Sequence, residues 1–172
     1  MNPDNQKHVH YTEVRRQDRL LDDAGQERLL NEGEYGFLAM CSESGGYGIP
    51  INYAREKTTM GDRIYFHCAP EGRKLAAIGK NNRVSFCVVG PTQVIPDKFT
   101  TAYESVIVFG KITGQLSDDE RRAALRLLVK KYCPRLMEKG EKYMEASFHR
   151  TNVLRLDIEH RTGKTKRTMP RA

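Results

Sequence analysis

Six short runs, apolar or alternating in polarity and joined mostly by short turns, constrain the fold of this chain more than any other feature. They are residues 36–41, 47–55, 64–68, 84–89, 104–112 and 152–160. Side chains that alternate between two faces are typical of β-strands, and runs that are apolar on both faces suit barrel strands. Because few of the runs are separated by helical crossovers, a parallel doubly wound sheet is disfavoured. The pattern predicts a mainly β protein, an antiparallel barrel with helices packed outside it.

Capping residues mark where two of the helices begin. Asp22 or Asp23 can cap a first helix, which Gly33 would end. Ser117 and Glu120 have the S-x-x-E spacing of a capping box at the start of a second, longer helix. No repeat or low-complexity segment interrupts this order, so the elements belong to one domain.

Length and composition limit the class of protein. A chain of 172 residues can bury one sizeable core, and 38% hydrophobic with 30% charged residues lies outside the disordered class. No run reaches the ~18 apolar residues of a membrane span, and the polar N-terminus lacks the apolar middle of a signal peptide. We therefore expect a cytoplasmic protein with no membrane partner. Its predicted divisions are a polar arm (1–20), a domain (21–165) and a basic tail (166–172).

The basic character of the chain points to anionic ligands. The formal net charge is +7, and the segment after His160 holds five Lys or Arg residues and no acid. This segment has no aromatic residues between its cations, which makes nucleic-acid binding unlikely.

Neither cysteines nor other ligand types form a metal motif. Cys41, Cys68, Cys87 and Cys133 are far apart, and three of them fall in strand-like runs where cysteine acts as a small hydrophobe. No His, Cys, Asp and Glu set has metal-ligand spacing, and neither a P-loop nor a G-x-S-x-G motif occurs. We expect no metal site and exclude the hydrolase and kinase motif classes.

The segment from Arg63 to Pro91 carries the strongest chemical signal. It predicts a strand containing His67, a tight turn, a short helix that begins near Arg73 and Lys74, and a second strand. Cations are electrostatically disfavoured at a helix N-terminus, so a bound anion is expected to compensate them there. The unpaired N–H groups of the first turn suit a phosphate. His67 shares a strand face with Tyr65 and could face whatever the phosphate carries.

Two further segments are weaker candidates. Pro50 opens the second half of a predicted strand, which implies an edge or a bulge whose backbone groups can pair with a planar ring. The residues 100–106 are polar and lead into a strong strand. Each of these patterns also fits an ordinary edge strand or turn.

Taken together, the motifs resemble a known family. The order G-x-L-A-x, Y-G-I-P-I-N-Y, I-Y-F-H-x-A-x-x-G-R-K, V-S-F-x-V-V-G and Y-E-S-V-I-V-F-G-K resembles the flavin-binding split-barrel proteins. More narrowly, it is similar to the nitroimidazole-resistance branch of the pyridoxamine 5′-phosphate oxidase-like superfamily. The resemblance covers about residues 15–166.

The resemblance implies a homodimer of six-stranded split barrels with a flavin at each subunit interface. His67 matches a histidine proposed to act near the flavin. The positions that match the family's cofactor-binding residues are Arg73 and Lys74 for the phosphate, Pro50, Ile51, Asn52 and Tyr53 beside the isoalloxazine ring, and Ser105 and Val106 near the cofactor. FMN is the expected flavin, with FAD as the alternative, and a deazaflavin presents the same phosphate and tricyclic ring.

One difference between this chain and the family pattern narrows the expected function. The chain has no tryptophan, and residues 160–164 do not match the substrate segment of true pyridoxamine phosphate oxidases, so vitamin B6 oxidation is not expected. The resemblance implies a flavin-dependent oxidoreductase that reduces small aromatic or nitroaromatic compounds. The alternative is a non-catalytic flavin carrier or sensor.

Overall fold

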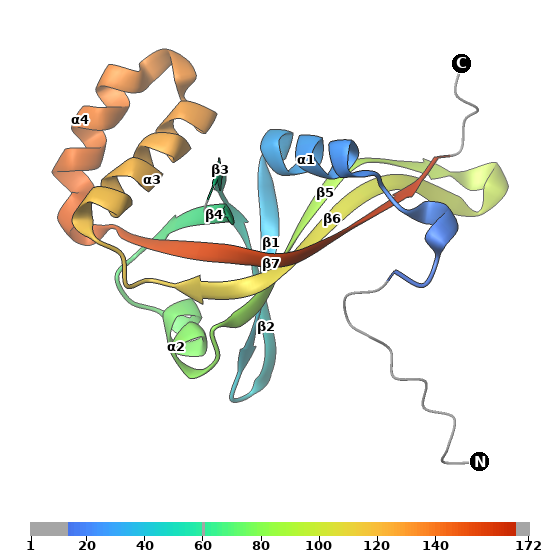
Figure 1. Ribbon diagram of the computed structural model, residues 1–172, viewed down its shortest axis with the longest axis horizontal. Coiled ribbons are helices and arrows are strands. Elements are labelled where there is room, and N and C mark those ends of the chain that lie inside the picture. Colours follow the sequence, from blue (N-terminus) through green and yellow to red (C-terminus); the bar gives the residue numbers. More distant parts are fainter. Residues whose placement is uncertain (1–13, 60, 168–172) are drawn as a thin grey trace.

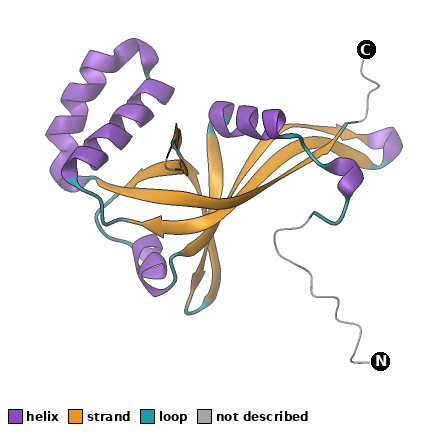
Figure 2. Ribbon diagram, in the orientation of Figure 1, coloured by secondary structure: helices purple, strands orange, loops and turns teal. Residues whose placement is uncertain are grey.

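The structure is a computed structural model that describes residues 14–59 and 61–167 (Figure 1). Over these residues, seven strands form one antiparallel sheet in the order β2-β1-β5-β6-β7-β4-β3. The strands are β1 (Tyr35–Ser42), β2 (Gly45–Asn52), β3 (Ala54–Thr58), β4 (Gly61–Cys68), β5 (Arg83–Ile95), β6 (Thr100–Thr113) and β7 (Asn152–Lys166). The α-helices are α1 (Asp23–Glu32), α2 (Arg73–Lys80), α3 (Asp118–Tyr132) and α4 (Met137–Ser147), and short 3₁₀ helices span Gln17–Arg19, Pro96–Lys98, Pro134–Leu136 and Phe148–Arg150. The predicted mainly β fold with peripheral helices is confirmed (Figure 2).

A corner at Tyr53 curls the sheet into a split barrel. β2 and β3 lie at opposite ends of the strand order, yet Tyr53 is the one residue between them in the sequence. The two edges of the sheet must therefore meet at this corner, although no ladder joins β2 to β3 within the described residues. The single strand predicted over residues 47–55 is broken here, which is why the sheet has seven strands where six were expected.

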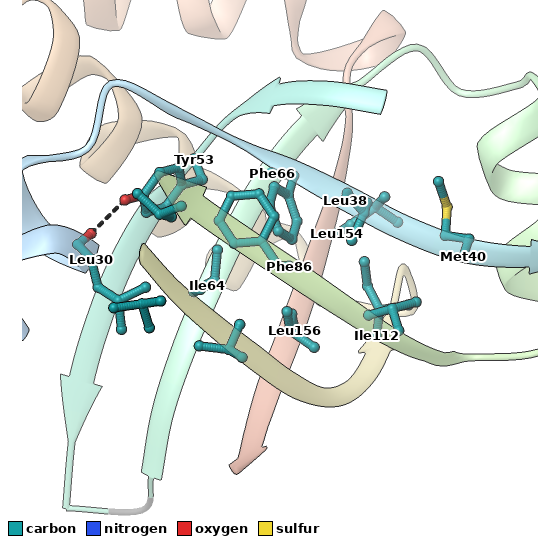
Figure 3. Packing of buried hydrophobic residues seen from close by; sticks show 14 of the residues in the cluster. Leu30, Leu38, Met40, Tyr53, Ile64, Phe66, Phe86, Ile112, Leu154 and Leu156 are labelled. Atoms are coloured by element: carbon teal, nitrogen blue, oxygen red, sulfur yellow. Dashed lines mark hydrogen bonds between the residues drawn. The ribbon is translucent and has the colours of Figure 1, made fainter. Parts of the chain in front are cut away.

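Hydrogen bonds from a distant helix hold the corner. The Tyr53 amide donates to the hydroxyl of Tyr132, at the end of α3, over 2.9 Å, and that hydroxyl lies 2.6 Å from the carbonyl oxygen of Glu34. The Tyr53 ring turns into the core, where it packs edge-on against Phe86 with centroids 4.9 Å apart. Its hydroxyl donates to the carbonyl oxygen of Leu30 over 2.8 Å, the dashed line of Figure 3.

Two apolar clusters flank the sheet. The inner cluster fills the barrel, and α1 contributes Leu30 to it (Figure 3). α2 contributes Ala77 and Ile78. The outer cluster joins α3 and α4 to the outward face of β3, β4 and β7 through residues such as Leu128, Met144 and Tyr65. Helices thus cover the outward face of the sheet on the β4 side.

The predicted N-terminal capping residues are confirmed, but the predicted capping box is only half formed. Asp22, rather than Asp23, accepts a hydrogen bond from the Gly25 amide over 2.8 Å at the start of α1. Ser117 accepts from the Glu120 amide over 3.2 Å at the start of α3. The Glu120 carboxylate does not complete the predicted box, because it instead accepts hydrogen bonds from side chains of β4 and β7.

Several elements extend beyond the predicted bounds. β5, β6 and β7 continue as a long ribbon past the barrel, to the right in Figure 1. A register shift beside Gly110 bends β6 against β7, as the glycine suggested, and a Cβ there would lie 2.0 Å from the carbonyl oxygen of Asp157. α4 was not expected, because no capping residue precedes it and its polar spacing gives a weak start signal.

An ion-pair cluster joins α1 to three strands of the barrel. The Arg55 side chain is only 3% exposed, and its Nε donates to Asp62 Oδ1 over 2.7 Å. Glu27 of α1 lies 3.8 Å from the Arg55 guanidinium and 3.6 Å from that of Arg161 in β7. Because Arg55 is buried, its charge depends on these partners rather than on water.

The Lys131 ammonium, in the last turn of α3, is buried against an aromatic ring rather than against a carboxylate. Its Nζ is buried without a hydrogen-bond partner in the described residues and lies 3.6 Å above the Tyr53 ring. Burial lowers the pKa of Lys131 from its ordinary 10.5 to about 8. Below pH 8 the folded and unfolded chains are both protonated here, so the full cost of burying the charge opposes folding. That cost falls as the pH rises from 8 toward 10.5.

Replacing Lys131 by methionine is therefore expected to stabilise the protein at pH 7 by about 1–3 kcal/mol, after allowing for the lost contact with the Tyr53 ring. The increase in wild-type stability between pH 8 and 10 should be absent in Lys131→Met. Urea unfolding at pH 7 and pH 9.5 measures both effects, with Lys130→Met on the exposed side of α3 as control. A loss of stability in Lys131→Met would show that the contact with the Tyr53 ring outweighs the burial cost.

Several predictions concern the ends of the chain and its surroundings. Residues 1–13 and 168–172, which contain most of the predicted arm and tail, lie outside the described residues. The described end of the arm joins β7, since Leu20 forms an isolated antiparallel bridge with Lys164. Among the described helices, none is long and apolar enough to cross a membrane.

Candidate functional site

The start of α2 presents unpaired backbone N–H groups together with two cations. Gly72 precedes the helix with φ +133°, a conformation that favours glycine, and no side chain caps the first turn. Ala77 and Ile78 bury the inner side of α2 in the barrel core, which fixes the direction of the helix. Its first turn contains two cations and no acid, and Glu71 precedes the Gly72 cap.

Arg73 and Lys74 have no carboxylate partner. Among the described residues, no Asp or Glu oxygen lies within 4.0 Å of either side chain. The Arg73 guanidinium instead lies 4.4 Å above the ring of Tyr47 in β2. Two cations in the first turn of an uncapped helix provide the charge, and the helix start provides the N–H donors, that a phosphate group requires.

His67 lies at the end of β4, next to Lys74. It pairs with Val153 of β7 and shares the outward face with Tyr65, as the sequence predicted. Burial by neighbouring atoms, and secondly the charge of Lys74, lowers the pKa of His67 from its ordinary 6.5. The imidazole is therefore mainly neutral at pH 7, with one nitrogen able to donate a hydrogen bond and the other able to accept one.

His67 also borders a pocket of about 600 Å³ between α3, α4 and the outward face of the sheet, which we call the α3–α4 pocket. Asn52, at the end of β2, lines the same pocket. The Asn52 side-chain amide donates to the carbonyl oxygen of Glu34 over 3.2 Å, which fixes its orientation. The structure thus brings Asn52, His67 and Lys74 into one region.

The other predicted site residues divide by the face they occupy. In β2, Pro50 and Asn52 pair with Phe37 and Tyr35 on the outward face, whereas Ile51 packs against the barrel core. Tyr53 is fully buried, and its hydroxyl is already hydrogen bonded inside the core. Ile51 and Tyr53 can therefore offer a ligand their backbone groups rather than their side chains.

Ser105 and Val106 lie elsewhere in the sheet. Both belong to β6, which β1 and β5 separate from β2, a distance of roughly 14 Å at ordinary strand spacing. The Ser105 side chain is half-buried opposite Val89 of β5, and Val106 is fully buried in the core. On the other side of β6, Ser105 pairs with Lys164 of β7, whereas His67 of β4 pairs with Val153, roughly 35 Å further along β7. Within one chain, these two residues therefore do not lie next to His67.

The outward face between β2 and β6 exposes large apolar side chains, and no helix of residues 14–59 and 61–167 covers it. Tyr35, Phe37 and Val89 are 60%, 49% and 58% exposed on this face. Tyr35 pairs directly with Asn52, so the uncovered face reaches the edge of the α3–α4 pocket. A contiguous exposed apolar surface of this kind is typical of an interaction site.

The residues of α4 that line the α3–α4 pocket were not predicted from the sequence. Gly140, Tyr143, Met144 and Ser147 line the α3–α4 pocket at helical spacing. That spacing was present in the sequence, but no strand or capping signal drew attention to it. Gly140 allows the close approach of the two helices, because a Cβ there would lie 2.4 Å from Cγ1 of Val129.

Comparison with known proteins identifies a matching family model. A family model described as Pyridoxamine 5′-phosphate oxidase matches residues 22–165. A search of curated proteins finds no match.

Similar solved structures include flavin proteins. A candidate 5-nitroimidazole antibiotic resistance protein from Bacteroides thetaiotaomicron VPI-5482 is 22% identical, with 85% of each chain covered and a TM-score of 0.68. An FAD and heme binding protein from Mycobacterium smegmatis is 20% identical, with 86% of this chain and 74% of that chain covered and a TM-score of 0.71. The flavocytochrome Anf3 from Azotobacter vinelandii is 20% identical, with 94% and 76% covered and a TM-score of 0.75. At these identities, the likeness to the solved structures shows the fold.

Proposed function

The chain belongs to the pyridoxamine 5′-phosphate oxidase family, and on that premise we propose that it is a flavoprotein that reduces small aromatic or nitroaromatic compounds. One observation carries the proposal: two cations without carboxylate partners flank the uncapped start of α2, next to a histidine on a pocket. FMN is the proposed flavin, and FAD is the alternative. A flavin supplies the two-electron chemistry that ordinary side chains lack.

The protein's own residues would bind and orient the reactants. Arg73 and Lys74 would hold the phosphate with charge-assisted hydrogen bonds, together with the first N–H groups of α2. The backbone of residues 50–53 would lie beside the flavin ring. Reduction of a nitro group to a nitroso group takes up two electrons and two protons and releases water. His67 would deliver one of those protons to the substrate.

We further propose a homodimer with the flavins at the interface. The uncovered apolar face of Tyr35, Phe37 and Val89 supports this, because a second copy would bury it. Ser105 lies on the same face, remote from His67 of its own chain, and would serve the site of the other copy. Val106 would act only through its backbone, since its side chain is buried.

The alternative function is a flavin carrier or sensor without turnover. Reducing the flavin-loaded protein with dithionite under anaerobic conditions and adding a nitroimidazole separates the two functions. The reductase proposal predicts rapid return of the oxidised flavin absorbance, faster than in a protein-free control. Reoxidation no faster than that control would favour the carrier.

Replacing His67 by alanine should slow this reoxidation by about 10²- to 10⁴-fold, the usual contribution of a positioned proton donor, and leave flavin affinity nearly unchanged. Because the pKa of His67 lies below 6.5, the wild-type rate should rise as the pH falls through that pKa, and the variant should lack this rise. Stopped-flow absorbance from pH 5 to 8 measures both, with the exposed His149→Ala as control. An unchanged rate and pH profile would remove His67 from the reaction.

A further inference from the structure

The α3–α4 pocket has the size and lining of a small-molecule site. Its volume of about 600 Å³ falls inside the range of ligand pockets. Most of its walls are apolar, contributed by Leu125, Leu128, Val129, Leu136 and Met144. The rings of Tyr132 and Tyr143 also line the pocket. Such walls suit a flat apolar body rather than a sugar or a metal ion.

Most polar groups on the lining are already committed to the protein. The Thr151 hydroxyl donates to the carbonyl oxygen of Ser147 over 2.9 Å, and the Ser147 hydroxyl donates to that of Tyr143 over 2.8 Å. The Tyr132 hydroxyl and the Asn52 amide serve the barrel corner. These four side chains therefore have little hydrogen-bonding capacity left for a ligand.

His67 and Lys139, like the exposed hydroxyl of Tyr143, are not committed in this way. Over residues 14–59 and 61–167, neither side chain has a hydrogen bond or an ion pair with the protein. Both can donate hydrogen bonds, and Lys139 carries a full positive charge. None of the fourteen residues that line the pocket is an Asp or a Glu. The pocket therefore has mostly apolar walls and a lysine charge that no carboxylate of its lining neutralises.

We propose that the α3–α4 pocket binds an aromatic carboxylate, with its ring between α3 and α4 and its carboxylate near Lys139. The ring would lie between the apolar walls, and the charge would be neutralised where no acid of the protein competes. This inference rests on the proposed function in one respect, because a ligand bordering His67 would be the acceptor that the flavin reduces. The binding itself requires no flavin.

Calorimetric titration of the full-length, flavin-loaded protein with three matched probes tests the pocket. The probes are 2-naphthoate, neutral 2-naphthamide and cationic 2-naphthylmethylammonium. We expect saturable 1:1 binding of 2-naphthoate, with an affinity about fivefold or more above that of the amide. The ammonium should bind most weakly. Equal binding of all three probes, or no saturable binding of 2-naphthoate, would overturn the proposal.

Variants locate the probe and its charge. Lys139→Glu should weaken 2-naphthoate binding about tenfold and leave 2-naphthamide binding unchanged, because only the anion uses the lysine charge. Lys130→Glu, an equal charge change on an exposed residue outside the pocket, should affect neither probe. Leu136→Trp at the pocket wall should weaken both. Unchanged 2-naphthoate binding in Lys139→Glu and Leu136→Trp would contradict the assignment.

A repeat titration on protein stripped of flavin separates this inference from the proposed function. The pocket inference predicts the same order of probe affinities in the stripped protein. If the chain takes up no flavin, the proposed function fails, and the probe titrations on the purified protein still decide the pocket.

Discussion

Replacing Lys74 by alanine is expected to weaken flavin binding by about 10- to 100-fold. A charge-assisted hydrogen bond to a phosphate contributes roughly 1.5–3 kcal/mol, and tenfold in affinity corresponds to about 1.4 kcal/mol. Lys74 has no carboxylate partner in the described part of the chain, so its removal breaks no ion pair and the fold should be retained. Part of the affinity that depends on ionic strength should disappear with it. Fluorescence titration of the stripped protein with FMN at low and high salt measures both effects.

The opposite end of the same helix supplies the control. Lys80 is exposed in the last turn of α2 and forms a surface ion pair with Glu43 over 3.0 Å. Lys80→Ala removes the same charge from the same element but should leave flavin affinity unchanged. If Lys74→Ala and Lys80→Ala bind FMN equally, Lys74 is not a phosphate ligand.

Replacing Asp62 by alanine is expected to destabilise the fold by about 3–5 kcal/mol, a range typical of leaving a buried charge without its partner. The Arg55 side chain, 3% exposed, would retain Asn31 over 3.2 Å and Glu27 over 3.8 Å as its only partners in the described part of the chain. For a chain of this length the melting temperature should fall by about 10 °C. Thermal unfolding followed by circular dichroism measures the change.

Two further variants distinguish the cost of leaving a buried charge unpaired from the cost of losing an ion-pair contact. Arg55→Met/Asp62→Ala removes both charges and should recover much of the stability, because an apolar pair avoids the cost of desolvation. Glu141→Ala breaks the exposed ion pair with Arg126 and should cost less than about 1 kcal/mol. If Asp62→Ala were as mild as Glu141→Ala, the buried Arg55 charge would not depend on Asp62.

The parts of the fold that local chemistry determines could be predicted from the sequence. Strand alternation gave the outward face shared by Tyr65 and His67. Asp22 and Ser117 act as the caps that their positions indicated. Gly72, with its positive φ, begins α2 beside the two predicted cations.

The parts that depend on distant partners could not be predicted. The corner at Tyr53 exists because Tyr132, 79 residues away, accepts its amide hydrogen, and no local pattern reports that contact. The α3–α4 pocket depends on the packing of α4, whose first residues carry no cap. For the candidate site, spacing identified His67 and the cations but missed Lys139, whose place on the α3–α4 pocket becomes evident only in three dimensions.

Flavin binding is the central claim, and the visible absorption spectrum of the purified protein tests it most directly. The account predicts a yellow protein, or one that turns yellow and stays so after FMN or FAD is added and the excess removed. Mass measurement of the compound released on denaturation would then distinguish FMN from FAD. A colourless protein that retains neither flavin would contradict the account.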